Sequence, residues 1–221
     1  MGWKAFAILA TNESGYFGTL PSHNAEAAEE VRGRLGLSDY EPLAEQRFET
    51  ALHPRRGALY IGAYPGGTIV CENALPSYFF DDRSQRAISG ASRKFAHFKE
   101  QLLALYPEGE VMAIVLHSVV NLWGYSVYSR GQLLRSAAGA SDNGLIANLG
   151  EPLPEELRGL RECAIDKVDE EGFGEELVFD VSARMFGRRM DAFDELPLRM
   201  TEYKRRTSSP VAFVKSLFGR K

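Results

Sequence analysis

The stretch that decides the fold is residues 111–157, VMAIVLHSVVNLWGYSVYSRGQLLRSAAGASDNGLIANLGEPLPEEL. Its first part, Val111–Val120, is an almost continuous apolar run, which predicts a central strand covered on both faces. Trp123–Tyr128 and Gln132–Ser136 flank the turn Ser129-Arg130-Gly131, and this pattern predicts a β-hairpin. The stretch is therefore built as a sheet element and does not resemble a catalytic motif.

Further strands are expected upstream of this stretch. Gly57–Val70 predicts a second hairpin around the turn Pro65-Gly66-Gly67. Trp3–Thr11 is apolar enough for a buried strand, and Arg47–Leu52 predicts a weak one. The two hairpins have similar turns, which either an internal duplication or the general chemistry of turns explains.

Four helices are predicted between and after these strands. The first begins after the cap residue Asn24 and ends near Gly36, and the second runs from Ser92 to Tyr106. A third is expected from Pro154 to about Val168, and a fourth over Leu177–Phe193, with an acidic turn at 169–176 between them. Together these elements predict an α+β fold, with a mostly antiparallel sheet of about six strands and two hairpins, flanked by helices.

The chain divides into a single α+β domain, residues 1–203, and a basic tail, residues 204–221. Of the 26 lysines and arginines, six lie after Tyr203, where there is no acidic residue, so 20 remain against 30 acidic side chains in the domain. An acidic domain repels nucleic acid, so no nucleic acid partner is expected. In the tail, one amphipathic helical face is predicted to contact a partner or a membrane: Val211, Phe213, Val214, Leu217 and Phe218, with Lys215 beside it.

Composition and motifs exclude several classes of protein. Cys71 and Cys163 are far apart in sequence and form no CxxC pattern, which favours a reducing, cytoplasmic location over a disulfide scaffold. The sequence contains no apolar run long enough to span a membrane. It also lacks dinucleotide, P-loop, zinc-protease and nucleophile-elbow motifs, so neither a metal nor a cofactor is expected.

A few polar residues are candidates for a pocket. His117 ends the predicted central strand, where a side chain is held rigidly and reaches solvent. Asp81 and Asp82 follow an aromatic segment, and adjacent carboxylates can bind a cation or alter each other's pKa. Asp142 and Asn143 form a polar turn. Each also has a purely structural explanation, as a satisfied histidine, a helix cap or a turn residue.

The segment 124–154 resembles a bacterial domain family of unknown function. The residues that carry the resemblance are Gly124-Tyr125, Gly131-Gln132-Leu133, Asp142-Asn143-Gly144 and Gly150-Glu151-Pro152-Leu153-Pro154. The resemblance implies no activity, cofactor or catalytic residue. The sequence departs from the family pattern at Ala147-Asn148-Leu149, where more acidic residues are expected.

Three functions are compatible with these observations. The leading hypothesis is a cytoplasmic bacterial protein without catalytic activity that binds a protein partner or a second copy of itself. The second is a small-molecule hydrolase or transferase with a site near His117 and Asp81/Asp82. The third is peripheral association of the basic tail with an anionic membrane surface. Convergence of His117 and the two aspartates in one pocket would favour the enzyme.

Overall fold

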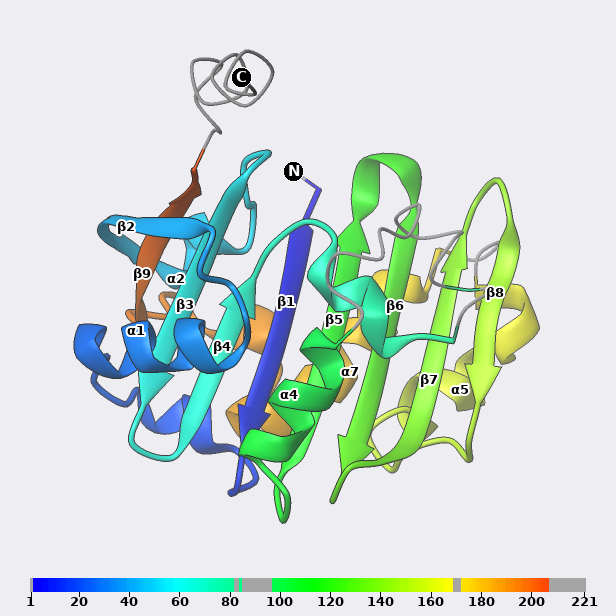
Figure 1. Ribbon diagram of the computed structural model, residues 1–221. Helices are drawn as coiled ribbons and strands as arrows, with labels where there is room; N and C mark the ends of the chain where they lie inside the picture. Colours follow the sequence, from blue (N-terminus) through cyan, green and yellow to red (C-terminus); the bar gives the residue numbers. More distant parts are fainter. Residues whose placement is uncertain (1, 82–83, 85–96, 169–171, 207–221) are drawn as a thin grey trace, which may run out of the picture.

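The computed structural model describes residues 2–81, 84, 97–168 and 172–206. One sheet of nine antiparallel strands, in the order β2-β9-β3-β4-β1-β5-β6-β7-β8, forms the centre of the molecule (Figure 1). The strands are β1 (Lys4–Thr11), β2 (Tyr40–Arg47), β3 (Ala58–Tyr64), β4 (Gly67–Cys71), β5 (Glu110–His117), β6 (Leu122–Ser129), β7 (Gln132–Ala140), β8 (Gly144–Leu149) and β9 (Arg199–Arg205).

The middle of the sheet is buried on both faces. β1 and β5 pair along their whole length, from Lys4 opposite His117 to Thr11 opposite Glu110. Six consecutive residues of β5, Val111–Leu116, are buried, as the continuous apolar run predicts. The two predicted hairpins, β3–β4 and β6–β7, are confirmed on either side of this central pair.

Helices cover both faces of the sheet (Figure 1). On one face, called the α7 face, side chains of the sheet pack against α2 (Phe48–Ala51) and α7 (Gly174–Phe186), with α5 (Leu157–Glu162) and the 3-10 turn η5 (Ile165–Lys167) beside them. The opposite face packs against α1 (Ala25–Arg34), the 3-10 turn η2 (Leu75–Phe79) and α4 (Phe98–Leu105). Short 3-10 turns also occur at Tyr16–Thr19, Ser118–Val120 and Met190–Ala192.

Helix ends follow the expected local chemistry. The Asn24 side chain accepts a hydrogen bond from the Ala27 N–H at 3.0 Å, which confirms it as the cap of α1. α7 ends at Gly187, whose φ of 74° is the left-handed conformation that glycine tolerates. The predicted fourth helix is therefore shorter than Leu177–Phe193 at its far end, and it begins earlier, at Gly174.

The sheet has nine strands where six were predicted. The three that the sequence did not reveal are β2, β8 and β9. β2 and β8 lie at the two edges of the sheet, where one face or both stay open and the apolar alternation that marks a strand is weak. β9 continues through Arg205, so the first residues of the predicted tail belong to the sheet.

Two local predictions were wrong. Arg47–Leu52, predicted as a strand, forms the short helix α2, because Phe48 and Ala51 are buried on one helical face. The predicted helix from Pro154 to Val168 is interrupted at Cys163, whose backbone is extended (φ −142°, ψ 125°). The first part of the predicted helix 92–106 lies outside the described residues, and its remainder is α4.

Candidate functional site

His117 is the last residue of β5 and is half-buried. Its Nδ1 is buried without a hydrogen-bond partner in the described part of the chain. Burial, followed by the charges of Lys4 and His117, lowers the pKa of His53, so both rings lie near Lys4 at one end of the sheet. This end therefore brings two imidazoles and a cation into one neighbourhood.

Among the other candidate residues, Asp81 makes a local contact with the chain that follows it. The Asp81 carboxylate accepts the Ser84 N–H at 2.8 Å, the geometry of a helix cap. Its charge adds to burial in raising the pKa of Tyr128, which pairs with Val111 at the end of β5 opposite His117. Asp82 lies outside the described residues.

Asp142 and Asn143 are exposed in the turn between β7 and β8, which confirms the turn prediction. The Asn143 N–H donates to the Ala140 carbonyl within this turn. Two strands, β6 and β7, continue the sheet between β5 and β8, so this turn is separated from His117. None of the three cavities described below is lined by the candidate residues.

The cysteines are both buried thiols in structural positions. Cys71 is fully buried in β4, and burial raises the pKa of its thiol well above the usual range. A thiol in this state forms little thiolate, which is the reactive species. The Cys163 Sγ contacts the Ala164 carbonyl at 3.5 Å. Within the described ranges, no group of three or more His, Cys, Asp or Glu side chains is arranged to hold a metal ion.

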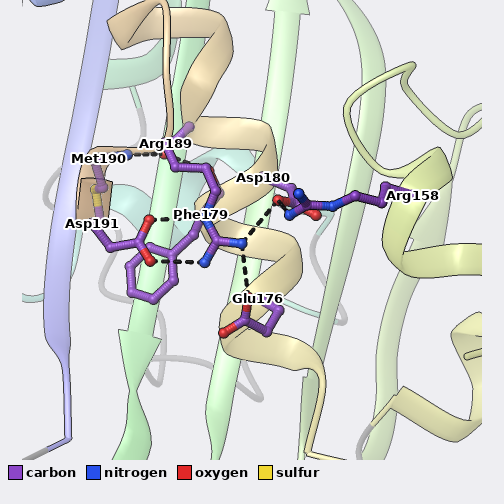
Figure 2. Close-up of polar contacts among 8 residues, drawn as sticks. Arg158, Glu176, Phe179, Asp180, Arg189, Met190 and Asp191 are labelled. Atoms are coloured by element: carbon purple, nitrogen blue, oxygen red, sulfur yellow. Dashed lines mark hydrogen bonds and ion pairs between the residues drawn. The ribbon is translucent and has the colours of Figure 1, made fainter. Parts of the chain in front are cut away.

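A dense polar network lies beside α7 (Figure 2). Arg189 donates to both carboxylate oxygens of Asp191, at 2.9 and 2.7 Å, and its Nη1 lies 2.8 Å from Glu176 and 3.1 Å from Asp180. Arg158 reaches Asp180 from α5 at 2.6 Å. The two arginines thus tie α5 and the segment after α7 to α7 itself.

This network is best explained as a structural brace. The Arg189 guanidinium is engaged by three carboxylates, so its charge is neutralised within the protein. A cavity of about 220 Å³ beside it is lined by residues of α5 and α7: Arg158, Gly159, Glu162, Phe173, Glu176 and Asp180. A larger cavity of about 290 Å³ lies among polar loops at one end of the sheet: Thr11, Asn12, Glu13, Ser14, Glu108, Gly109, Glu110, Ser129 and Arg130.

A second ion pair is fully buried near the β8 edge. The Arg135 Nε donates to both oxygens of the Glu156 carboxylate, at 3.0 and 3.1 Å, and both side chains are at most 1% exposed. Arg135 Nη1 donates to the Asn148 side chain and to the Leu149 and Gly150 carbonyls. Arg135 therefore fixes the end of β8 and the connection that follows it.

β8 itself forms one edge of the sheet (Figure 1). Its sequence, Gly144-Leu-Ile-Ala-Asn-Leu149, contains no charge and no proline. In the described part of the chain, no backbone group outside β7 hydrogen-bonds to it, and the Ser84 hydroxyl donates to the Ile146 carbonyl. A register shift disturbs the pairing around Ile146, while Ala147 to Leu149 pair regularly with β7. An edge of this kind can accept another strand.

Exposed leucines surround the end of this strand. Leu133, Leu134 and Leu149, called the leucine surface below, are 39%, 38% and 40% exposed. Gly150 approaches the Leu134 carbonyl so closely that a Cβ there would lie 2.0 Å from its oxygen, which brings the two strand ends together. Three large apolar side chains are thus exposed at this end of β7 and β8, and exposed apolar side chains are common at protein interfaces.

The opposite edge of the sheet is protected. β2 contains Pro42, the carboxylates Glu41 and Glu45, and a register shift between Pro42 and Glu45. Arg199 lies 3.8 Å from Glu45, across the pair of strands β2 and β9. Both edges contain a register shift, but β2 also carries proline and charge, which prevent unwanted strand addition. The two edges therefore differ in charge and proline content, which influence whether another chain can pair with them.

The sequence could have revealed part of this site. The apolar run Gly144–Leu149 stands between the turn at Asp142-Asn143 and Gly150, which is a usable strand signal. Its place at the edge depends on long-range pairing, which no local pattern contains. Among the described residues, no helix is both long enough and apolar enough to cross a membrane. The predicted tail contacts, Val211 to Phe218, lie outside the described residues.

Comparison with known proteins gave one match. The model of a family of unknown function, DUF6928, matches residues 6–195, from β1 to the segment before β9. No curated protein and no solved structure matches the chain.

Proposed function

Because the chain belongs to DUF6928, a family of unknown function, we propose its role from its own surface: a binding module that pairs with a second copy of itself through β8. The predicted relation to an uncharacterised domain family is confirmed by this membership. In the proposal, two β8 strands align antiparallel about a two-fold axis and join the sheets of two copies.

The observation that carries the proposal is the contrast between the two edges of the sheet. β8 combines a charge-free strand with the leucine surface, whereas β2 carries proline and charged side chains. Natural proteins protect edges that must stay free, so an unprotected edge is expected to have a partner. The buried Arg135–Glu156 pair supports this proposal, because it holds the strand end rigid before any partner binds.

A second copy is the partner that the charges favour. The domain carries ten more acidic than basic side chains up to Tyr203, so two copies repel each other over most of their surfaces. β8 has no ionisable side chain, and a contact there avoids like charges in close approach. The same strand on both partners also satisfies the self-complementarity that a two-fold interface requires.

The two alternative functions receive less support. A hydrolase or transferase site near His117 and Asp81 requires these side chains to converge in a pocket, and neither lines the cavities of about 220, 250 and 290 Å³. Membrane association through the tail rests on residues outside the described ranges. A cytoplasmic location belongs to the proposal as an expectation from the two cysteines, which form no CxxC pattern.

Sedimentation velocity over a range of protein concentrations tests the proposal. The wild-type chain is expected to form dimers, and Leu149→Lys is expected to weaken dimerisation about tenfold or more, because it places two cations at the joined edges. The matched control is Leu43→Lys, which changes an exposed leucine on the protected β2 edge and should leave the dimer intact. Circular dichroism of both variants establishes that each remains folded.

Two results would overturn the proposal. The first is a wild-type chain that remains monomeric at high micromolar concentration. The second is a dimer that Leu43→Lys weakens as much as Leu149→Lys does, since the contact would then not lie at β8.

A further inference from the structure

A small cavity with a basic lining lies near the β2 edge of the sheet, at the opposite end of the strand order from β8. Its volume is about 250 Å³, and it is formed where β3 and β9 meet the turn before β3. The residues that line it are Leu43, Arg55, Arg56, Gly57, Ala58, Glu202, Tyr203 and Lys204. Three of these are cations and one is an anion.

The three cations have no acidic partner in the described part of the chain. Arg55, Arg56 and Lys204 are exposed, and no described carboxylate lies within ion-pair distance of any of them. The one carboxylate of the lining, Glu202, already accepts hydrogen bonds from Tyr60 at 3.3 Å and Gln46 at 3.0 Å. Glu41 lies opposite Lys204 across β2 and β9, and its carboxylate is 3.7 Å from Arg206. In a domain with excess acidic residues, three cations without ion pairs around a cavity indicate a site for an anion.

The backbone holds these cations beside one another. The Ala58 N–H donates to the Arg55 carbonyl at 2.9 Å and closes a tight turn, in which Gly57 has a φ of 79°. The Gly57 carbonyl accepts the Arg205 N–H at 3.1 Å, and Ala58 is the cross-strand partner of Lys204. The turn that carries the two arginines is thus anchored to the strand that carries the lysine.

We propose that this cavity binds the phosphate group of a small phosphorylated molecule. Two guanidinium groups and one ammonium group, together with the negative Glu202, give the lining a net charge of about +2. This matches the charge of about −1.5 to −2 that a phosphate monoester carries at neutral pH. A carboxylate has half that charge and would leave more of the positive charge uncompensated. Leu43 and Ala58 supply apolar wall beside the cations, which suits the carbon part of such a ligand.

Titration of the 15N-labelled full chain with inorganic phosphate tests the site by NMR. The expected result is saturable shifts of the amide signals of Gly57, Ala58 and Lys204, and no such shifts with sodium chloride at matched ionic strength. The double variant Arg55→Gln/Arg56→Gln changes two exposed side chains and should bind phosphate at least about tenfold more weakly. Arg161→Gln, which removes an exposed arginine from α5, is the control and should bind as the wild type does.

Three outcomes would overturn the inference. Phosphate produces no shift at the turn, or chloride produces the same shifts, which would indicate general screening of charge. The third is equal weakening by Arg161→Gln and by the double variant. The cavity and β8 lie on opposite sides of the sheet centre, so failure here leaves the proposed self-association untouched.

Discussion

Arg135 shows how one side chain can organise a whole strand end. Its guanidinium contacts Glu156 and three groups of β8 and the following residue, and Glu156 in turn accepts the Leu153 N–H at 3.0 Å. Sequence reasoning could not identify this pair, because a charged residue in a strand is expected to face solvent. By contrast, Asn24 was predicted correctly, since a helix cap depends on only a few neighbouring residues.

We expect Arg135→Met to lower the free energy of unfolding by about 3–5 kcal/mol, because it leaves the Glu156 carboxylate buried without its cation. Arg158→Met is the matched control. Arg158 is 68% exposed, and loss of its ion pair with Asp180 should cost about 1 kcal/mol or less. Urea denaturation at one protein concentration measures both. An equal loss of unfolding free energy in the two variants would show that the buried Arg135–Glu156 pair contributes no more to stability than the exposed pair does.

At the scale of elements, the strands whose residues are uniformly buried were predicted correctly from the sequence. The strand at Val111 and the two hairpins came out correctly, because continuous apolar runs and turn residues are local signals. α2 was mistaken for a strand because four residues are too few to show a helical period. β9 was missed because it pairs with β2 and β3, which lie more than 130 residues earlier in the chain.

Two glycines in helices should respond in opposite ways to alanine. Gly174 begins α7, and a Cβ there would lie 2.1 Å from the Trp123 ring, so Gly174→Ala should destabilise the protein by about 1–3 kcal/mol. Gly33 lies in the last turn of α1, where an added Cβ would meet no atom within 4 Å, so Gly33→Ala should stabilise it by about 0.5–1 kcal/mol. Thermal unfolding compares the two, and changes of the same sign would contradict this account of helix packing.

Across the whole molecule, the sheet separates two different edges. The β8 edge contains neither a charge nor a proline, whereas the β2 edge is charged and lies beside the basic cavity. The candidate residues chosen from sequence were selected one by one for their chemistry, and none of those that the structure describes lines the cavities of about 220, 250 and 290 Å³. A site made from backbone edges and unpaired charges is defined by long-range pairing, which appears only once the sheet is assembled.

The stability of the protein should fall as the pH drops below neutrality, because the half-buried ring of His23 resists protonation. The His23 Nδ1 lies 3.2 Å from both the carbonyl oxygen and the amide nitrogen of Ala63, and its Nε2 lies 2.9 Å from the Thr201 hydroxyl. Burial lowers its pKa more than Ala63 and Glu45 raise it, and burial also lowers the pKa of His53.

Unfolded histidine binds a proton near pH ~6.5, whereas the folded rings do so only at lower pH. Well above that pH both states hold neutral rings, and below it the unfolded state gains protons that the folded state does not. The free energy of unfolding should therefore decrease between about pH 7.5 and about pH 5.5, and His23→Gln should make this decrease smaller. His97→Gln removes an exposed ring as the control and should retain the wild-type dependence. Urea denaturation at several pH values measures how the free energy of unfolding depends on pH. The same dependence in His23→Gln as in the wild type would mean that His23 does not contribute to it.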